Sequence, residues 1–201
     1  MKKYILITAF LVFATIEAQN SKPDYERVYV ETGFVKPLGK LSDKFDVSPS
    51  FGFWFRSRIQ KKDYIDFGFN FFIPKNAPNI NFKHQDSILS YKSKHFAINI
   101  GARFAKVAPL LLTSNNFNFE WNSGIGLALN AYQAPDEIKF EGDDNSGEIL
   151  TTIFLSQGIK INYKNVGIQC HYQWSPYGLF NEKLPDNFGS QSLIFGIVYR
   201  Q

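Results

Sequence analysis

The chain has 201 residues, a formal net charge of +4 at pH 7 and an aromatic content of 17%, including 21 phenylalanines. A positive balance this mild and this scattered gives no basis for a nucleic-acid partner. Beyond the N-terminal segment, no apolar run reaches the about 18 residues that a membrane-spanning helix requires, so helical spans are excluded as well.

The N-terminal segment has the organisation of a secretory signal peptide. Lys2 and Lys3 precede an apolar run over residues 4–13, and the small residue Ala18 suits cleavage before Gln19. The run is too short for a spanning helix, although a retained N-terminal anchor is the alternative. We predict a signal peptide over residues 1–18 and one exported domain over residues 19–201.

The remainder of the chain alternates between apolar and polar residues. Residues 64–73 alternate Ile or Phe with Asp, Gly or Asn, and residues 117–130 do the same over a longer stretch. Because successive side chains of a strand point to opposite faces, each stretch predicts a strand with one apolar and one polar, glycine-rich wall. Eight such segments can be drawn in chain order: 26–35, 49–60, 64–73, 93–106, 116–131, 149–163, 166–174 and 188–200.

The connections between these segments alternate in length. Residues 61–63 and 164–165 are tight turns and residues 107–115 form a medium one, whereas 36–48, 74–92, 132–148 and 175–187 are long and polar. Outer-membrane barrels combine short periplasmic turns, longer external loops and an even number of strands. We therefore predict an all-β fold, an eight-stranded antiparallel up-and-down transmembrane β-barrel in the cell outer membrane.

The alternation does not by itself say which wall faces inward, and a soluble carrier of the lipocalin kind has the opposite arrangement. Two observations favour a polar interior. Glycines such as Gly68, Gly124 and Gly158 recur on the polar wall, where a narrow eight-stranded interior needs small residues. The other wall carries almost no charge, which an exposed surface in water does not tolerate.

The polar wall also carries ionisable residues, which have to pair because an isolated charge in a narrow interior is strongly destabilising. We predict an interior polar network that fills the lumen, with a gated ion path as the alternative. Its members are Glu31, Arg56, Arg58, Asp66, Arg103, Glu120, Lys160 and His171.

Taken together, the signal-peptide junction at Ala18, the alternating strands and the final stripe of Leu193, Phe195, Ile197 and Tyr199 resemble one known family. The chain is similar to the small outer-membrane β-barrel proteins of Bacteroidota-type bacteria, which include PorT-like proteins. The final stripe resembles the signal that the barrel-insertion machinery reads, although Arg200 and Gln201 follow the last aromatic residue. The resemblance implies a stabiliser, a secretion accessory, an adhesin or a small pore.

A catalytic site has one candidate pair, His171 and Ser175, on the polar wall near a long loop. Residues four apart on a strand are separated by about 13 Å, which is too far for a nucleophile and its base. Lipid A deacylases carry His and Ser two positions apart, where this chain has Gln173. We interpret His171 as a hydrogen-bonded interior residue and predict no catalytic residues. The lone cysteine, Cys170, is interpreted as an apolar wall residue.

The long loop over residues 132–148 is acidic, and Asp143, Asp144 and Glu148 are its candidate binding residues. Carboxylates around a glycine can hold calcium, but their spacing does not fit an EF-hand. Contact with cation-bridged lipopolysaccharide is the favoured interpretation. No metal site and no cofactor are predicted.

The leading functional hypothesis is a non-enzymatic integral outer-membrane protein that acts as an accessory subunit or binding surface through its external loops. The alternatives are a narrow channel for ions or small molecules and a lipid A-modifying enzyme. The predicted partners are outer-membrane lipids and lipopolysaccharide, the barrel-insertion machinery during biogenesis, and a larger outer-membrane complex.

Overall fold

A computed structural model describes residues 26–43, 45–73, 79–84, 87–92, 94–109, 117–133, 147–176 and 190–201. Eight of its strands close into one barrel, in the order β1-β10-β9-β8-β7-β6-β3-β2. The strands are β1 (Glu26–Leu38), β2 (Ser48–Gln60), β3 (Asp63–Phe72), β6 (Lys94–Pro109), β7 (Phe117–Gln133), β8 (Gly147–Tyr163), β9 (Val166–Trp174) and β10 (Gln191–Arg200).

Every neighbouring pair in the barrel is antiparallel, and β1 pairs with β10 to close it. The predicted eight-stranded antiparallel up-and-down barrel is therefore confirmed. The predicted signal peptide, residues 1–18, lies outside the described residues. No helix within the described ranges has the length and apolar character needed to cross a membrane.

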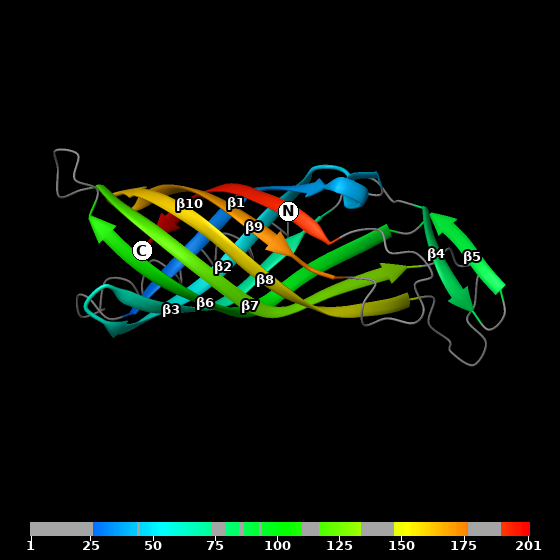
Figure 1. Cartoon of the computed structure of the whole chain (residues 1–201), viewed down its shortest axis with the longest axis horizontal. Helices are drawn as coiled ribbons and strands as arrows, with labels where there is room; N and C mark the ends of the chain where they lie inside the picture. Colours follow the sequence, from blue (N-terminus) through cyan, green and yellow to red (C-terminus); the bar gives the residue numbers. More distant parts are fainter. Residues whose placement is uncertain are drawn as a thin grey trace, which may run out of the picture.

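The two ends of the barrel differ. Figure 1 shows the β2–β3 and β8–β9 turns and the C-terminus at one end, which we call the short-turn end. Beyond the opposite, long-loop end lies a separate two-stranded sheet of β4 (Asn79–His84) and β5 (Ser87–Lys92). The prediction of a plain loop over residues 74–92 is wrong at these positions. Six-residue strands provide too few alternating positions to stand out from a polar segment.

The first long connection also contains regular structure, the 3-10 helix η1 (Gly39–Asp43). Gly39 begins it with a positive φ of 56°, a conformation that favours glycine. Leu41 of this helix is buried, and its carbonyl accepts a hydrogen bond from the Phe45 amide at 3.0 Å. The helix thus directs an apolar side chain into the molecule at the long-loop end.

The two walls of the barrel have opposite chemistry. Outward-facing Phe55, Ile125 and Ile168 are 57%, 59% and 61% exposed, whereas inward-facing Asp66 and Glu120 are fully buried. The apolar wall is on the outside, so the lipocalin-like alternative is wrong. Phenylalanines of adjacent strands contact one another on this outer wall, as where Phe51 and Phe71 stack with ring centroids 5.3 Å apart.

The interior is narrow, and glycine provides space for the larger side chains opposite. A Cβ atom on Gly52 would lie 1.9 Å from the amide oxygen of Asn70, and one on Gly158 would lie 2.6 Å from the His171 ring. Glycine at these positions leaves the space that the interior polar side chains occupy.

Candidate functional site

Six buried charged side chains from six strands meet inside the barrel, toward the short-turn end. Asp66 of β3, Arg56 of β2, Glu120 of β7, Lys160 of β8, Glu31 of β1 and Arg103 of β6 form this ion-pair network. Each sits on the polar face of its strand, because the alternation directs every second side chain inward.

One half of the network is organised by the Arg56 guanidinium. Its Nε and Nη2 atoms donate to the two carboxylate oxygens of Asp66 at 2.6 and 2.7 Å. Its Nη1 and Nη2 atoms donate to both oxygens of Glu120 at 2.7 and 2.8 Å. The planar guanidinium is therefore matched to two carboxylates at once, the arrangement in which Arg binds most strongly.

The other half is organised by the Glu31 carboxylate. Oε1 accepts from Lys160 Nζ at 2.7 Å and from Arg103 Nη1 at 2.8 Å. Lys160 Nζ also lies 3.8 Å from Glu120 Oε1, which joins the two halves into one chain of alternating charge. Three carboxylates thus face three cations, and the network is neutral.

Aromatic rings cover the cations. The Arg103 guanidinium carbon lies 3.6 Å from the ring centroid of Trp54, and that of Arg56 lies 4.4 Å from the ring centroid of Tyr29. The Trp54 indole N–H donates to Asn70 Oδ1 at 3.1 Å, which fixes the ring. Cation–π contact is strongest where water is excluded, so these rings stabilise the buried charges.

Two predicted network residues lie apart from this chain of ion pairs. Arg58 is near the short-turn end of β2, and it donates to the backbone carbonyls of Gln60 and Lys61 at 3.3 Å. Arg58 is half-buried there, and the sequence pattern does not contain this position at the rim. His171 is buried, and its Nε2 lies 3.1 Å from Gln169 Oε1.

His171 and Ser175 have different hydrogen-bond partners. Ser175 Oγ accepts from Gln173 Nε2 at 3.0 Å, so the residue between the two candidates bonds the serine. Gln173 Oε1 in turn accepts from Asn99 Nδ2 at 2.9 Å. This middle part of the lumen is therefore held by amide and hydroxyl groups and not by charge.

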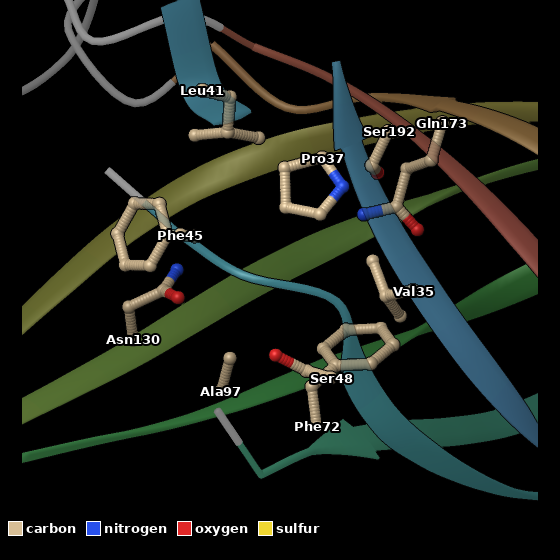
Figure 2. Close-up of a pocket in the computed structure, with 10 residues that line it drawn as sticks. All are labelled: Val35, Pro37, Leu41, Phe45, Ser48, Phe72, Ala97, Asn130, Gln173 and Ser192. Carbon is tan, nitrogen blue, oxygen red and sulfur yellow. The ribbon is translucent and has the colours of Figure 1, made fainter. Parts of the chain in front are cut away.

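A cavity of about 60 Å³ lies above this amide layer, at the long-loop end, and we call it the vestibule (Figure 2). Leu41, Phe45 and Phe72 line it with apolar groups, and Asn130, Gln173 and Ser192 add polar ones. The sequence pattern did not predict this cavity, because its lining comes from seven strands, from η1 and from the segment between η1 and β2. The sequence signal that could have indicated a buried site here is the presence of the apolar residues Leu41 and Phe45 within a polar loop.

The acidic loop lies mainly outside the described part of the chain. Asp143 and Asp144 fall in its undescribed section, and Glu148 lies in β8, opposite Tyr132 of β7. Within the described ranges, no group of three or more His, Cys, Asp or Glu residues is arranged to hold a metal ion.

A closed eight-stranded antiparallel barrel with an apolar outer wall and a charged lumen has the fold of the small outer-membrane β-barrels. Among solved structures, the chain is similar to Neisserial surface protein A, with 12% sequence identity and a TM-score of 0.51. The alignment covers 88% of this chain and 94% of that one.

Weaker likenesses involve the attachment invasion locus protein Ail of Yersinia pestis. Its structure in a phospholipid bilayer nanodisc has 13% identity and a TM-score of 0.47, over 89% of this chain and 100% of that one. Its complex with the heparin analogue sucrose octasulfate has 11% identity and a TM-score of 0.46, over 88% and 97%. No family model and no curated protein sequence matches the chain.

Proposed function

We propose that the chain is a non-enzymatic integral protein of the cell outer membrane that acts as a binding surface or accessory subunit through its long-loop end. The outward apolar wall supports the location, because apolar side chains this exposed are stable against lipid and not against water. The short turns would then face the periplasm and the long loops the exterior, as in other barrels of this class.

The ion-pair network is the observation that carries this proposal. Six paired charges from six strands, with the rings of Trp54 and Tyr29 against two of them, join the strands across the lumen toward the short-turn end. Opening an ion path there would separate buried pairs, at about 3–5 kcal/mol for each partner left uncompensated. This favours a closed barrel over a narrow channel, so the interactions of the protein fall to its rims.

The partners follow from the location. Lipids would cover the outer wall, lipopolysaccharide would contact the loops, and the barrel-insertion machinery would act on the final strand, β10. Membership of the PorT-like proteins of Bacteroidota-type bacteria, and attachment to a larger outer-membrane complex, rest on the sequence pattern alone. Asp143, Asp144 and Glu148 remain the proposed loop-binding residues.

Affinity purification from native membranes in mild detergent tests the proposal. The full chain should retain a partner protein or lipopolysaccharide, and a variant lacking residues 79–92 should lose that partner while still inserting. Planar-bilayer recordings of the purified barrel should show no conductance. Steady conductance would contradict the closed barrel, and a change in lipid A mass that disappears in His171→Ala would favour an enzyme.

A further inference from the structure

The short-turn end of the barrel carries an excess of positive charge. Outside the neutral ion-pair network, the cations whose side chains are described at this end are Arg58, Lys61, Lys62, Lys106, Lys164 and Arg200. Asp63 is the one acidic side chain described there outside the network. The adjoining segments leave this balance unchanged, since residues 19–27 contain two cations and two carboxylates and residues 110–116 contain no charged residue. Anionic groups are therefore attracted to this end.

Two of these lysines lie at the edge of the lipid-facing outer wall. The Lys106 side chain is 63% exposed and alternates along β6 with the buried Arg103 and Ala105, so it points outward. Lys106 pairs in the register with Asp63, the first residue of β3, which places it at the level of the β2–β3 turn. Lys164 is exposed in the β8–β9 turn. Because β7 lies between β6 and β8, the two lysines flank β7 at this edge.

The outer wall between the two lysines is aromatic. Trp121 of β7 pairs with Lys106 in the register, and Phe117 of β7 pairs with Tyr163 of β8, with ring centroids 4.6 Å apart. The Lys164 ammonium lies 5.5 Å from the ring centroid of Tyr163. All three rings are exposed. Tyr and Trp rings favour the membrane interface, and a lysine beside them can extend its ammonium to the level of the phosphates.

The backbone of the β8–β9 turn is fixed from the final strand. The Arg200 side chain donates to the Lys164 carbonyl, and the Arg200 amide donates to the Asn165 carbonyl at 2.8 Å. Lys164 has a φ of 51°, a conformation that favours glycine or asparagine, so the backbone gives no reason for a lysine here. The turn is thus held by its carbonyl groups, while the Lys164 side chain stays exposed.

We infer that the short-turn end selects anionic phospholipids, whose phosphate groups contact Lys106 and Lys164 while their acyl chains cover the rings between them. The inference rests on the membrane location proposed above and adds the charge of the lipid. An acidic protein would match the positive charge, but the exposed rings continue the wall that acyl chains cover, which favours a lipid. A zwitterionic lipid supplies the same acyl chains without the net negative charge, so comparing the two lipids isolates the effect of the lysines.

Brominated lipids provide the test, because bromine on an acyl chain quenches the fluorescence of a tryptophan that it contacts. The folded full chain with Trp174→Phe is reconstituted in phosphatidylcholine vesicles, which leaves the outward Trp121 and the fully buried Trp54. The probes are brominated phosphatidylglycerol and brominated phosphatidylcholine. We expect the phosphatidylglycerol probe to bind beside Trp121 about fivefold more tightly, the effect of about one basic side chain near an anionic surface. The preference should weaken at about 1 M salt.

Variants test whether the two lysines cause the preference. Lys106→Gln with Lys164→Asn removes both charges, and asparagine suits the positive φ of the turn. This variant should lose at least half of the preference for phosphatidylglycerol. Lys36→Gln with Lys40→Gln is the matched control, because it makes the same change in net charge with two exposed lysines at the long-loop end. It should keep the full preference. If the first variant does not fold, Lys106→Gln alone should still lose part of it.

Two results would overturn the inference and leave the proposed function intact. The first is equal quenching of Trp121 by both probes, which would mean that lipid covers the wall without regard to charge. The second is an unchanged preference in the folded variant that lacks Lys106 and Lys164. A different result, no quenching of Trp121 by either probe, would contradict a lipid-facing wall and overturn the proposed membrane location together with the inference.

Discussion

The two halves of the barrel lumen are held by different kinds of interaction. Toward the short-turn end, Arg56 and Glu31 each bind two oppositely charged groups. Toward the long-loop end, the vestibule is lined by amide, hydroxyl and apolar groups around a cavity. The first half is held by ion pairs, whereas the second contains unfilled space.

The largest effect is expected from removing one charge of the network. Glu120→Leu leaves Arg56 and Lys160 without one of their partners, so the free energy of unfolding should fall by about 3–5 kcal/mol. Urea titration in lipid vesicles measures it. Asn122→Leu, on the same strand, should be milder unless it overfills the lumen. Equal stability of Glu120→Leu and Glu120→Gln would contradict a network that depends on charge.

The outer wall encloses both halves and provides the second test. Phe69 lies on this wall in β3 and pairs with Phe53 and Ile100 of the adjacent strands. Phe69→Arg should impair insertion by about 2–4 kcal/mol if Phe69 lies near the bilayer midplane. Tyr199→Arg, near the end of β10, should cost only about 0–1 kcal/mol at the interface. Equal insertion of both variants, judged by the shift in gel mobility on boiling, would contradict a lipid-facing wall.

Removing a matched pair of charges sharpens the comparison. The double variant Arg56→Met with Asp66→Leu leaves two carboxylates against two cations, so the rest of the network stays neutral. Its loss of stability should be smaller than the sum of the two single losses, with a coupling of about 0.5–3 kcal/mol. Unfolding of all four proteins in the double-mutant cycle gives this coupling. Additive losses would mean that the two residues act independently.

The smallest effect is expected in the vestibule. Asn130→Leu removes an amide whose Nδ2 atom has no hydrogen-bond partner among the described residues, and it places an apolar side chain of similar size beside Phe45 and Ala97. The free energy of unfolding should change by less than about 1.5 kcal/mol, the usual range for a substitution that conserves volume. A loss as large as that of Glu120→Leu would show that both halves of the lumen are equally constrained.

Strand positions could be predicted from the sequence because a lipid-facing wall imposes strict alternation over many residues. The segment over residues 166–174 matches β9 at both ends, and 49–60 differs from β2 by one residue. The same alternation identified the inward face of Glu31, Arg56 and Glu120. The alternation does not indicate how far along the barrel axis a residue lies. For this reason Arg58 was grouped with these residues although it lies at the rim.

The pairing within the network and the vestibule could not be predicted in this way. Lys160 binds Glu31, which is 129 residues away and on a strand that is not its neighbour. Such contacts across the lumen depend on barrel closure and on the stagger of the strands, which no local pattern contains. The burial of Leu41 in η1 could not be predicted for a similar reason, because it depends on the residues of other strands that line the vestibule.

Glu31 has a consequence for how the barrel is assembled. It lies on β1, while its two cations lie on β6 and β8, and β1 meets β10 only when the sheet closes. In an open sheet Arg103 and Lys160 therefore lie apart from this carboxylate, because neither β6 nor β8 is a neighbour of β1. Closure brings the missing carboxylate to Arg103 and Lys160, so sealing the last seam and neutralising the interior are one event. A barrel in which β1 and β10 are not fully paired would then be destabilised by its unpaired charges as well as by the unpaired backbone groups of the two edge strands.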